Sequence, residues 1–404
     1  MNNNQIISSR IAAAAKDLAE RYYGQGPLPH LHLHVSVRGE PLLEQCYGYA
    51  RDGGTVLEKD AIYRIASMTK PVIVAAFMTL VEEGAASFDM RLADIFPAFA
   101  EMQLWSGSCD ATGALESLPC DTPITLYDLV RHSAGLTYSF NAATPIDRLY
   151  AEQALDSFHQ RRDAEGYAAA LAALPLVYRP GTRFHYSVAI DLLGAVIERL
   201  SGMGLDQFLD RRIFAPLGME DSFFVIPPEK EHRLADAWMW DGKGDPQLYD
   251  RGAQSRWRIS QKFYSAGGGL LSTVQDYHRF LGMVMAGGTW NDVRILKPES
   301  IALMRHNHLP GGGDLERESS VCLSETSLPG IGMGLGGAVM IDPAKASAPA
   351  SIGTYFWGGI LSTGFFMDPK HEIIGLVMTQ LMPSGMTNLR EDFRRMVYGA
   401  VHDQ

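Results

Sequence analysis

Cysteine, basic charge and long apolar runs are all scarce in this sequence, and each scarcity excludes a class of protein. Four cysteines in 404 residues are too few for a disulfide scaffold. Cys109 and Cys120 could pair in a loop, but we expect free thiols. The formal net charge is −11, with no basic stripe, which argues against nucleic acid and anionic membrane surfaces as partners. No stretch approaches the roughly 20 apolar residues of a membrane-spanning helix, and no signal peptide is visible, so we expect a cytoplasmic protein.

The patterning predicts an α/β protein whose sheet is closed by both ends of the chain. A helix is expected over 9–23, and alternating residues predict strands at 30–38 and 42–51. Near the other end, strand patterns return at 334–341, 351–358, 362–369 and 372–381, before an amphipathic helix at 389–402. The middle is mainly helical, most clearly at 148–174 and 188–201.

This order predicts two domains. Residues 1–80 and 330–404 would form a discontinuous sheet domain, and residues 81–329 an inserted helical domain. We expect the active site in a cleft between them. Oligomeric state is left open.

Three alternating histidines, His30, His32 and His34, share one face of the first predicted strand. We expect that face to point to solvent. Carboxylate and cysteine ligands are not grouped nearby, so the pattern does not favour a metal site. No other segment calls for a metal or a cofactor.

A serine nucleophile needs a neighbouring base, because a free hydroxyl is protonated at neutral pH. No serine here stands in the Gly-x-Ser-x-Gly elbow of α/β-hydrolases, which excludes that fold. The chain does contain Ser67-Met-Thr-Lys70, followed by Pro71 and an apolar run typical of a buried helix. A spacing of three along a helix brings both side chains onto one face. Pro71 suits the first helical turn.

Two further elements could complete such a site. Arg179-Pro-Gly is a turn that delivers Tyr186 to the start of a helix, where its hydroxyl could shuttle a proton. An ordinary interfacial tyrosine is the alternative. Trp357-Gly-Gly-Ile360 places two glycines in a predicted strand. Such glycines mark either a close approach to the backbone or a bulge.

In this order, the three elements resemble the Ser-x-x-Lys, Tyr-x-Asn and Lys-Thr-Gly motifs of the penicillin-recognising serine enzymes. Three more segments, 129–136, 214–219 and 266–273, look like parts of the class C β-lactamase relatives. The resemblance spans nearly the whole chain. It implies a class C β-lactamase-like fold, with an antiparallel sheet flanked by helices and a large inserted domain.

Two departures from that pattern favour an ester over a β-lactam substrate. Val188 stands where the family has the Asn that binds a substrate amide, and Trp357 where it has the Lys that helps hold a carboxylate. Each loss would leave a polar group of a β-lactam under-satisfied, at about 1–3 kcal/mol. The Tyr-Ser-x and Trp-Gly-Gly pattern is similar to the family VIII carboxylesterases. A weak β-lactamase side activity is left open.

The resemblance also implies roles for individual residues. Ser67 would be the nucleophile that forms an acyl-enzyme, with Lys70 and Tyr186 sharing the acid and base work. The backbone N–H groups of Ser67 and Ile360 would form the oxyanion hole. The expected substrate-binding residues are Trp357, Gly358, Gly359, Val188, Tyr127, Tyr138 and Phe140.

Three alternatives remain open at this point. One is an acyltransferase like the lovastatin side-chain transferase, which shares the acyl-enzyme and differs in the acceptor. A second is a β-lactamase or D-alanyl peptidase. The third is a non-catalytic binding protein on the same fold.

Overall fold

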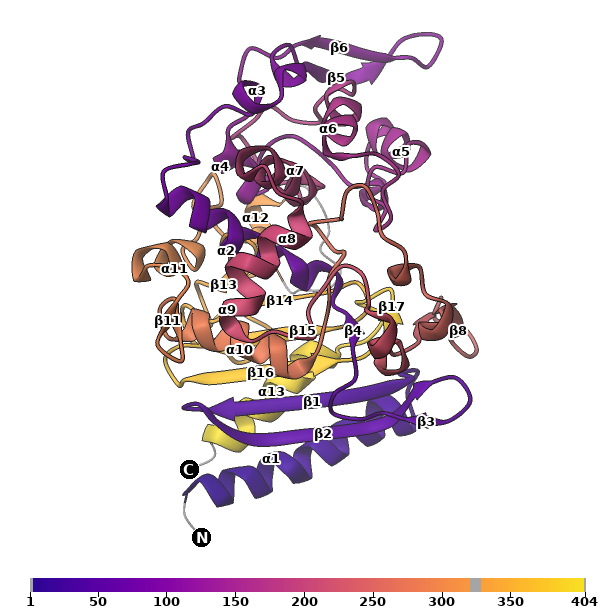
Figure 1. The fold of residues 1–404 in the computed structure, drawn as a ribbon, viewed down its shortest axis with the longest axis vertical. Helices are drawn as coiled ribbons and strands as arrows, with labels where there is room; N and C mark the ends of the chain where they lie inside the picture. The colour runs from indigo at the N-terminus through magenta and orange to yellow at the C-terminus, as the bar shows by residue number, and fades with distance from the viewer. Residues whose placement is uncertain (1–2, 320–327, 403–404) are drawn as a thin grey trace.

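The centre of the computed structural model, which describes residues 3–319 and 328–402, is an antiparallel sheet built from both ends of the chain. Its eight strands, in spatial order, are β12 (Ile331–Met333), β13 (Ala338–Met340), β14 (Tyr355–Gly358), β15 (Gly364–Asp368), β16 (Ile373–Met378), β1 (His30–Val37), β2 (Glu40–Arg51) and β3 (Thr55–Val56). The two ends of the chain meet where β1 pairs with β16, with Leu33 opposite Val377. The predicted sheet closed by both termini is therefore present (Figure 1).

Helices pack on this sheet and on one another. They are α1 (Asn3–Ala19), α2 (Thr69–Glu82), α3 (Leu92–Ile95), α4 (Leu126–Val130), α5 (Pro145–Glu152), α6 (Ala164–Ala172), α7 (Ala189–Ser201), α8 (Leu205–Leu209), α9 (Ala215–Leu217), α10 (Val274–Met285), α11 (Pro298–Met304), α12 (Leu315–Glu318) and α13 (Leu389–His402). The remaining strands form small separate sheets: β4 (Tyr63–Arg64) with β9 (Leu271–Ser272), β5 (Gln103–Cys109) with β6 (Leu115–Pro119), β10 (Thr289–Trp290) with β11 (Val293–Arg294), and β7 (Ala237–Met239) between β8 (Gln247–Asp250) and β17 (Leu381–Met382).

Helices cover both faces of the large sheet. Neighbouring residues on a strand point to opposite faces, and on β15 Phe366 contacts Phe393 of α13 while Phe365 contacts Tyr277 of α10. Helices α1 and α13 pack together on the first face. The second face carries α10, and beyond it lies α2, whose residues Thr69 to Leu80 are all buried and which packs against α7.

One sequence-based expectation about the helices needs correction. Residues 148–174 do not form one helix, because α5 ends at Glu152 and α6 starts only at Ala164. The side chain of Asp163 caps α6 by accepting a hydrogen bond from the N–H of Gly166 at 2.9 Å, and such a cap favours a new helix start over a continuous one. Helix α10, from the middle segment of the chain, packs on β16 of the large sheet.

The expectation that His30, His32 and His34 face solvent is wrong. All three are buried, with exposed fractions of 0%, 0% and 7%. Strand β1 is central in the sheet, and its second face is covered by β4 and α10. His32 Nδ1 lies 3.2 Å from the hydroxyl of Tyr63, and the ring of His34 lies 4.7 Å from that of His278.

The described residues include three of the four cysteines and the thirteen helices. Cys46, Cys109 and Cys120 are free thiols, and Cys322 lies outside the described residues. Among the described helices, none has both the length and the apolar character needed to cross a membrane. Nor do the described His, Cys, Asp and Glu side chains form a group of three or more that could hold a metal ion.

The buried histidines predict a loss of stability in mild acid. Burial lowers the pKa of His30 and of His34 to about 4, whereas both return to about 6.5 in the unfolded chain. Between these pH values the unfolded state binds more protons than the folded state. The contribution of the two histidines to the free energy of unfolding is therefore fully present above about pH 6.5 and is lost as the pH falls toward 4. At pH 5 each of these histidines should lower the free energy of unfolding by about 2 kcal/mol.

Urea unfolding at pH 7 and pH 5 checks this prediction. His34→Leu should reduce the difference in unfolding free energy between the two pH values by about 2 kcal/mol. His232→Gln, a change at an exposed histidine, should leave that difference unchanged. Equal pH dependence in wild type and His34→Leu would contradict the assignment.

Candidate active site

Ser67 stands in a tight turn held in place by its neighbours. It lies in a single 3₁₀ turn, Ala66–Met68, that leads directly into α2. Ala66 has a φ of 45°, a conformation that costs energy for a residue with a Cβ atom and persists only when the surroundings enforce it. Arg64, two residues earlier, is fully buried and donates to Asp250 from Nε at 2.8 Å. The backbone before Ser67, the candidate nucleophile, is therefore held in place by buried contacts.

The structure brings Ser67, Lys70 and Tyr186 together. Ser67 Oγ lies 3.1 Å from Lys70 Nζ and 2.9 Å from the Tyr186 hydroxyl. Lys70 and Tyr186 are 1% and 6% exposed, while Ser67 keeps partial access to solvent. Lys70 Nζ also lies 4.7 Å from the centroid of the Tyr186 ring. One oxygen thus sits between two groups that can take or give a proton, as the motif spacing predicts.

A buried carboxylate lies behind Lys70. Lys70 Nζ donates to the backbone carbonyl of Gly267 at 2.7 Å. Asp191 Oδ1 in turn accepts from the N–H of Gly267 at 3.0 Å and from Ser265 Oγ at 2.6 Å. Burial raises the pKa of Asp191, and the Lys70 cation opposes that rise. A Cβ atom on Gly267 would lie 2.2 Å from Asp191 Oδ2, so glycine is required for this close approach.

Aromatic rings surround Tyr186 on several sides. Its ring centroid lies 5.2 Å from Tyr138, 5.6 Å from Trp357 and 4.9 Å from His132. Phe140 stacks on Tyr138 at 4.6 Å and is 57% exposed, which places it at the rim of this aromatic group. Burial lowers the pKa of His132 well below its ordinary value, so this ring packs against Tyr186 in its neutral form.

The two glycines that follow Trp357 leave space for two different neighbours. A Cβ atom on Gly359 would lie 2.5 Å from the carbonyl oxygen of Ile65, in the turn that carries Ser67. A Cβ atom on Gly358 would lie 2.2 Å from the guanidinium carbon of Arg390, which comes from α13. These positions are close approaches to the backbone, one of the two interpretations that the sequence left open. They bring Ile360 next to the Ser67 turn.

Two of the expected substrate-binding residues lie elsewhere. Tyr127 contacts Phe88, Arg131 and His308, and its hydroxyl lies 2.7 Å from His308 Nδ1. It therefore belongs to a separate aromatic group. Val188 is 0% exposed, and its N–H donates to the carbonyl of Thr137 at 3.2 Å. Its side chain supports the site from within the core.

The sequence did not reveal Asp191, the Gly267 carbonyl or Phe158 as neighbours of the site. Asp191 lies in the first turn of α7, five residues after Tyr186, and nothing in that spacing announces a contact with residue 267. Gly267 lies in the segment 266–273, whose family resemblance indicates no contact with Lys70. Phe158 packs against the cluster formed by Ala66, Ala237 and Leu361, and a Cβ atom on Gly268 would meet its ring at 2.5 Å. These contacts join parts of the chain that are far apart in sequence.

The antiparallel sheet flanked by helices and the clustered Ser, Lys and Tyr side chains are typical of one class of enzyme, the serine hydrolases related to penicillin-recognising proteins. A family model described as "Beta-lactamase" matches residues 15–399. The chain belongs to this family and is one of its serine hydrolases. The fold and the family expected from the motifs are thereby confirmed.

Similar proteins include both curated relatives and solved structures. Protein Rv1367c of Mycobacterium tuberculosis is 37% identical over 344 residues, which cover 82% of this chain and 80% of the relative. Esterase EstB of Burkholderia gladioli is 30% identical over 368 residues, which cover 87% of this chain and 86% of the relative. The structure of "EstCE1, a hydrolase with promiscuous acyltransferase activity" superposes with a TM-score of 0.81 at 25% identity, covering 97% of this chain and 99% of that one.

The close approach at Gly359 predicts a large effect of one added methyl group. Gly359→Ala should push the Ile65–Ala66 turn, and Ser67 with it, away from the strand. A displacement of about 1 Å can cost on the order of 10²-fold in rate, so we expect such a loss in kcat on p-nitrophenyl acetate. The control is Gly399→Ala, the same change where a Cβ atom meets nothing within 4 Å. Near-normal kcat in folded Gly359→Ala would contradict the prediction.

Proposed function

We propose that this protein is a serine carboxylesterase that hydrolyses short-chain carboxylic esters through an acyl-enzyme on Ser67. The observation that supports this most directly is the position of Ser67 Oγ within 3.1 Å of Lys70 Nζ and 2.9 Å of the Tyr186 hydroxyl. The aromatic surroundings, rather than polar groups, make an ester the favoured substrate. EstB, an esterase by name, supports the same class.

The reaction proceeds in two steps on this geometry. Ser67 Oγ attacks the ester carbonyl carbon as its proton passes to the Lys70–Tyr186 pair, and the tetrahedral intermediate collapses by expelling the alcohol, which takes that proton. Water then attacks the acyl-enzyme, the same pair accepts and returns a proton, and the carboxylic acid leaves. The buried carboxylate of Asp191 stabilises positive charge on Lys70. It also accepts from the N–H of Gly267, the residue whose carbonyl Lys70 contacts.

The negative charge of the intermediate falls on the former carbonyl oxygen. We assign its stabilisation to the backbone N–H groups of Ser67 and Ile360. The packing of Gly359 on the Ile65 carbonyl supports this assignment, because it holds residue 360 beside the Ser67 turn. Arg390 donates from Nε to the carbonyl of Thr363 at 2.9 Å and from Nη2 to that of Gly359. Arg390 of α13 thus holds both ends of the loop between β14 and β15.

The substrate would enter along Trp357, Gly358 and Gly359, with its acyl group against Trp357 and the Tyr138–Phe140 pair. An apolar wall of this kind suits a neutral acyl chain better than an anionic β-lactam. The cleft between two domains and the cytoplasmic location remain predictions from the sequence.

Acyl transfer is the second candidate function, because the printed name of EstCE1 includes promiscuous acyltransferase activity. Transfer and hydrolysis share the acyl-enzyme and differ only in whether an alcohol or water attacks it. Incubation of p-nitrophenyl butyrate with added alcohols, followed by product analysis, separates the two. A dominant alkyl butyrate product at low alcohol concentration would favour the acyltransferase.

The role of Ser67 predicts a complete loss of activity without a loss of fold. Ser67→Ala removes only the hydroxyl, so ester turnover and labelling by a fluorophosphonate probe should both disappear, while the melting temperature stays within a few degrees. Ser87→Ala, at an exposed serine beyond the end of α2, is the matched control and should retain both. Turnover above a few per cent in Ser67→Ala would show that another residue is the nucleophile, and a protein that binds without catalysis would not label at all.

The aromatic wall predicts the order of substrate preference. Wild-type kcat/KM should be far higher for p-nitrophenyl butyrate than for the β-lactam nitrocefin, and it should fall as the acyl chain lengthens to octanoate. Trp357→Lys, which restores the family's usual residue, should lower the ester value through loss of the apolar contact. A wild-type ratio of butyrate to nitrocefin below one would favour the β-lactamase interpretation.

A further inference from the structure

Arg394 is a buried arginine in the second turn of α13. Its side chain is 6% exposed, and Nε makes no hydrogen bond within residues 3–319 and 328–402. The guanidinium carbon lies 5.1 Å from the centroid of the Phe356 ring. Burial lowers the pKa of Arg394, with Glu391 opposing this effect. A buried charge is normally paired with an opposite charge. An anion bound at the guanidinium of Arg394 would supply that pairing.

The charged neighbours of Arg394 are occupied by other partners. Glu391 accepts from Ser347 Oγ and, at 3.0 Å, from Arg395 Nη2. Arg390 donates to the carbonyls of Thr363 and Gly359. Arg395 is 41% exposed in its side chain and pairs with Asp392 at 2.6 Å as well as with Glu391. By contrast, Nε of Arg394 has no hydrogen-bond partner among the described residues, and its guanidinium lies over the Phe356 ring.

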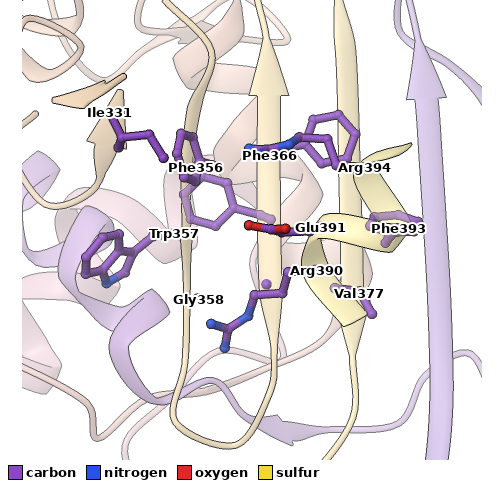
Figure 2. A pocket seen from close by; sticks show the side chains of 12 residues that line it. Ile331, Phe356, Trp357, Gly358, Phe366, Val377, Arg390, Glu391, Phe393 and Arg394 are labelled. Carbon is purple, nitrogen blue, oxygen red and sulfur yellow. The ribbon is translucent and has the colours of Figure 1, made fainter. Parts of the chain in front are cut away.

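A cavity lies where Arg394 is buried, between α13 and the strands β14, β15 and β16 (Figure 2). Its volume is about 40 Å³, and apolar side chains dominate its wall, including those of Ile331, Phe356, Phe366 and Phe393. Three charged residues, Arg390, Glu391 and Arg394, also line it. One water-sized group needs about 10–15 Å³ by this measure, so the space suits a molecule of about three or four non-hydrogen atoms.

Most of this cavity lies on the side of β14 away from Ser67, although Trp357 and Gly358 of the proposed substrate site also line it. The side chain of Trp357 leaves β14 on the side away from the labelled phenylalanines (Figure 2) and meets Tyr186. Phe356, the preceding residue, points to α13 and Arg394. Successive residues of the strand therefore face two different sites.

We propose that the cavity binds a short-chain carboxylate of the size of formate or acetate, with its carboxylate on the guanidinium of Arg394. The planar donors of arginine match a carboxylate in geometry. The phenylalanine wall would take the methyl group of acetate. A bulkier oxyanion such as phosphate carries more charge than one arginine balances and has no apolar part to place against the rings. This binding does not depend on the proposed esterase activity.

Saturation-transfer NMR on the full chain tests the proposal with acetate itself as the probe. Transfer from protein to the acetate methyl protons should be saturable in wild type and lost in Arg394→Met, which keeps the apolar stem of the side chain. Arg395→Met removes the same charge one residue along the helix and should bind acetate like wild type. Equal transfer in Arg394→Met and wild type would overturn the proposal, as would its loss in Arg395→Met to the same degree.

Thermal unfolding supplies a second measurement and separates binding from a structural role of Arg394. Acetate should raise the melting temperature of wild type to a plateau, whereas sodium chloride of the same ionic strength should not. Without acetate, Arg394→Met should be at least as stable as wild type, because an unpaired buried charge is removed. An equal rise with chloride would show an adventitious ion only and would overturn the carboxylate assignment.

A third measurement uses wild type alone, so it stands even if Arg394→Met fails to fold. In protein with labelled phenylalanine, the acetate methyl protons should show nuclear Overhauser effects to a small set of buried rings. Ile331→Phe, which fills the cavity and keeps Arg394, should abolish them. Effects that persist in Ile331→Phe would place acetate elsewhere and overturn the proposal.

Discussion

The packing of the Ile65–Ala66 backbone against Gly359 is the constraint on which the rest of the site depends. A Cβ atom at residue 359 would lie 2.5 Å from the Ile65 carbonyl and 3.0 Å from the Ala66 Cβ atom. This contact joins the turn before α2 to the loop after β14, two segments almost 300 residues apart. It places the Ser67 turn and residue 360 next to each other, so the nucleophile and the proposed oxyanion donors are set by one contact.

Hydrogen bonds from buried side chains also hold the backbone of residues 64–66 in place. The side chain of Gln380 accepts from the N–H of Arg64 and donates to its carbonyl, both at 3.1 Å. Thr363 Oγ1 donates to the carbonyl of Ile65 at 3.3 Å. Each of these hydrogen bonds connects the region before α2 to the C-terminal strands. The Gln380 amide bonds both backbone groups of Arg64, and Thr363 Oγ1 is a second donor to the Ile65 carbonyl, which also accepts from the N–H of Met68. These bonds help to hold Ala66 at a positive φ.

Strand β14 gives the molecule two sites with opposite character. Trp357 extends the aromatic surroundings of Tyr186, where the site has few charges. Phe356 faces α13, where its ring lies 5.1 Å from the guanidinium carbon of the buried Arg394. Between them, Gly358 makes room for Arg390, whose donors reach the carbonyl of Gly359. A single strand therefore connects the back of the sheet to the proposed catalytic centre through backbone contacts.

Sequence by itself determined the elements whose signals are local. The helix α13 and the start of the apolar α2 follow from periodicity, and the Ser67–Lys70 pairing follows from helical spacing. The motif order also identified the family and the fold, which the comparisons confirm. Of the aromatic residues expected to bind substrate, Tyr138 lies beside Tyr186 and Phe140 stacks on Tyr138, whereas Tyr127 belongs to another aromatic group. Aromatic residues carry no sequence signal for which other ring they will contact.

Only the tertiary structure decided the features that need two distant segments at once. The alternation of His30, His32 and His34 indicated a strand correctly, but its burial depended on α10 and β4 covering the outer face. Asp191 and Gly267 meet behind Lys70 because α7 and the 266–273 segment pack on α2. A periodicity reports which residues share a face, and the partner on that face is set by packing between elements that the local sequence does not encode.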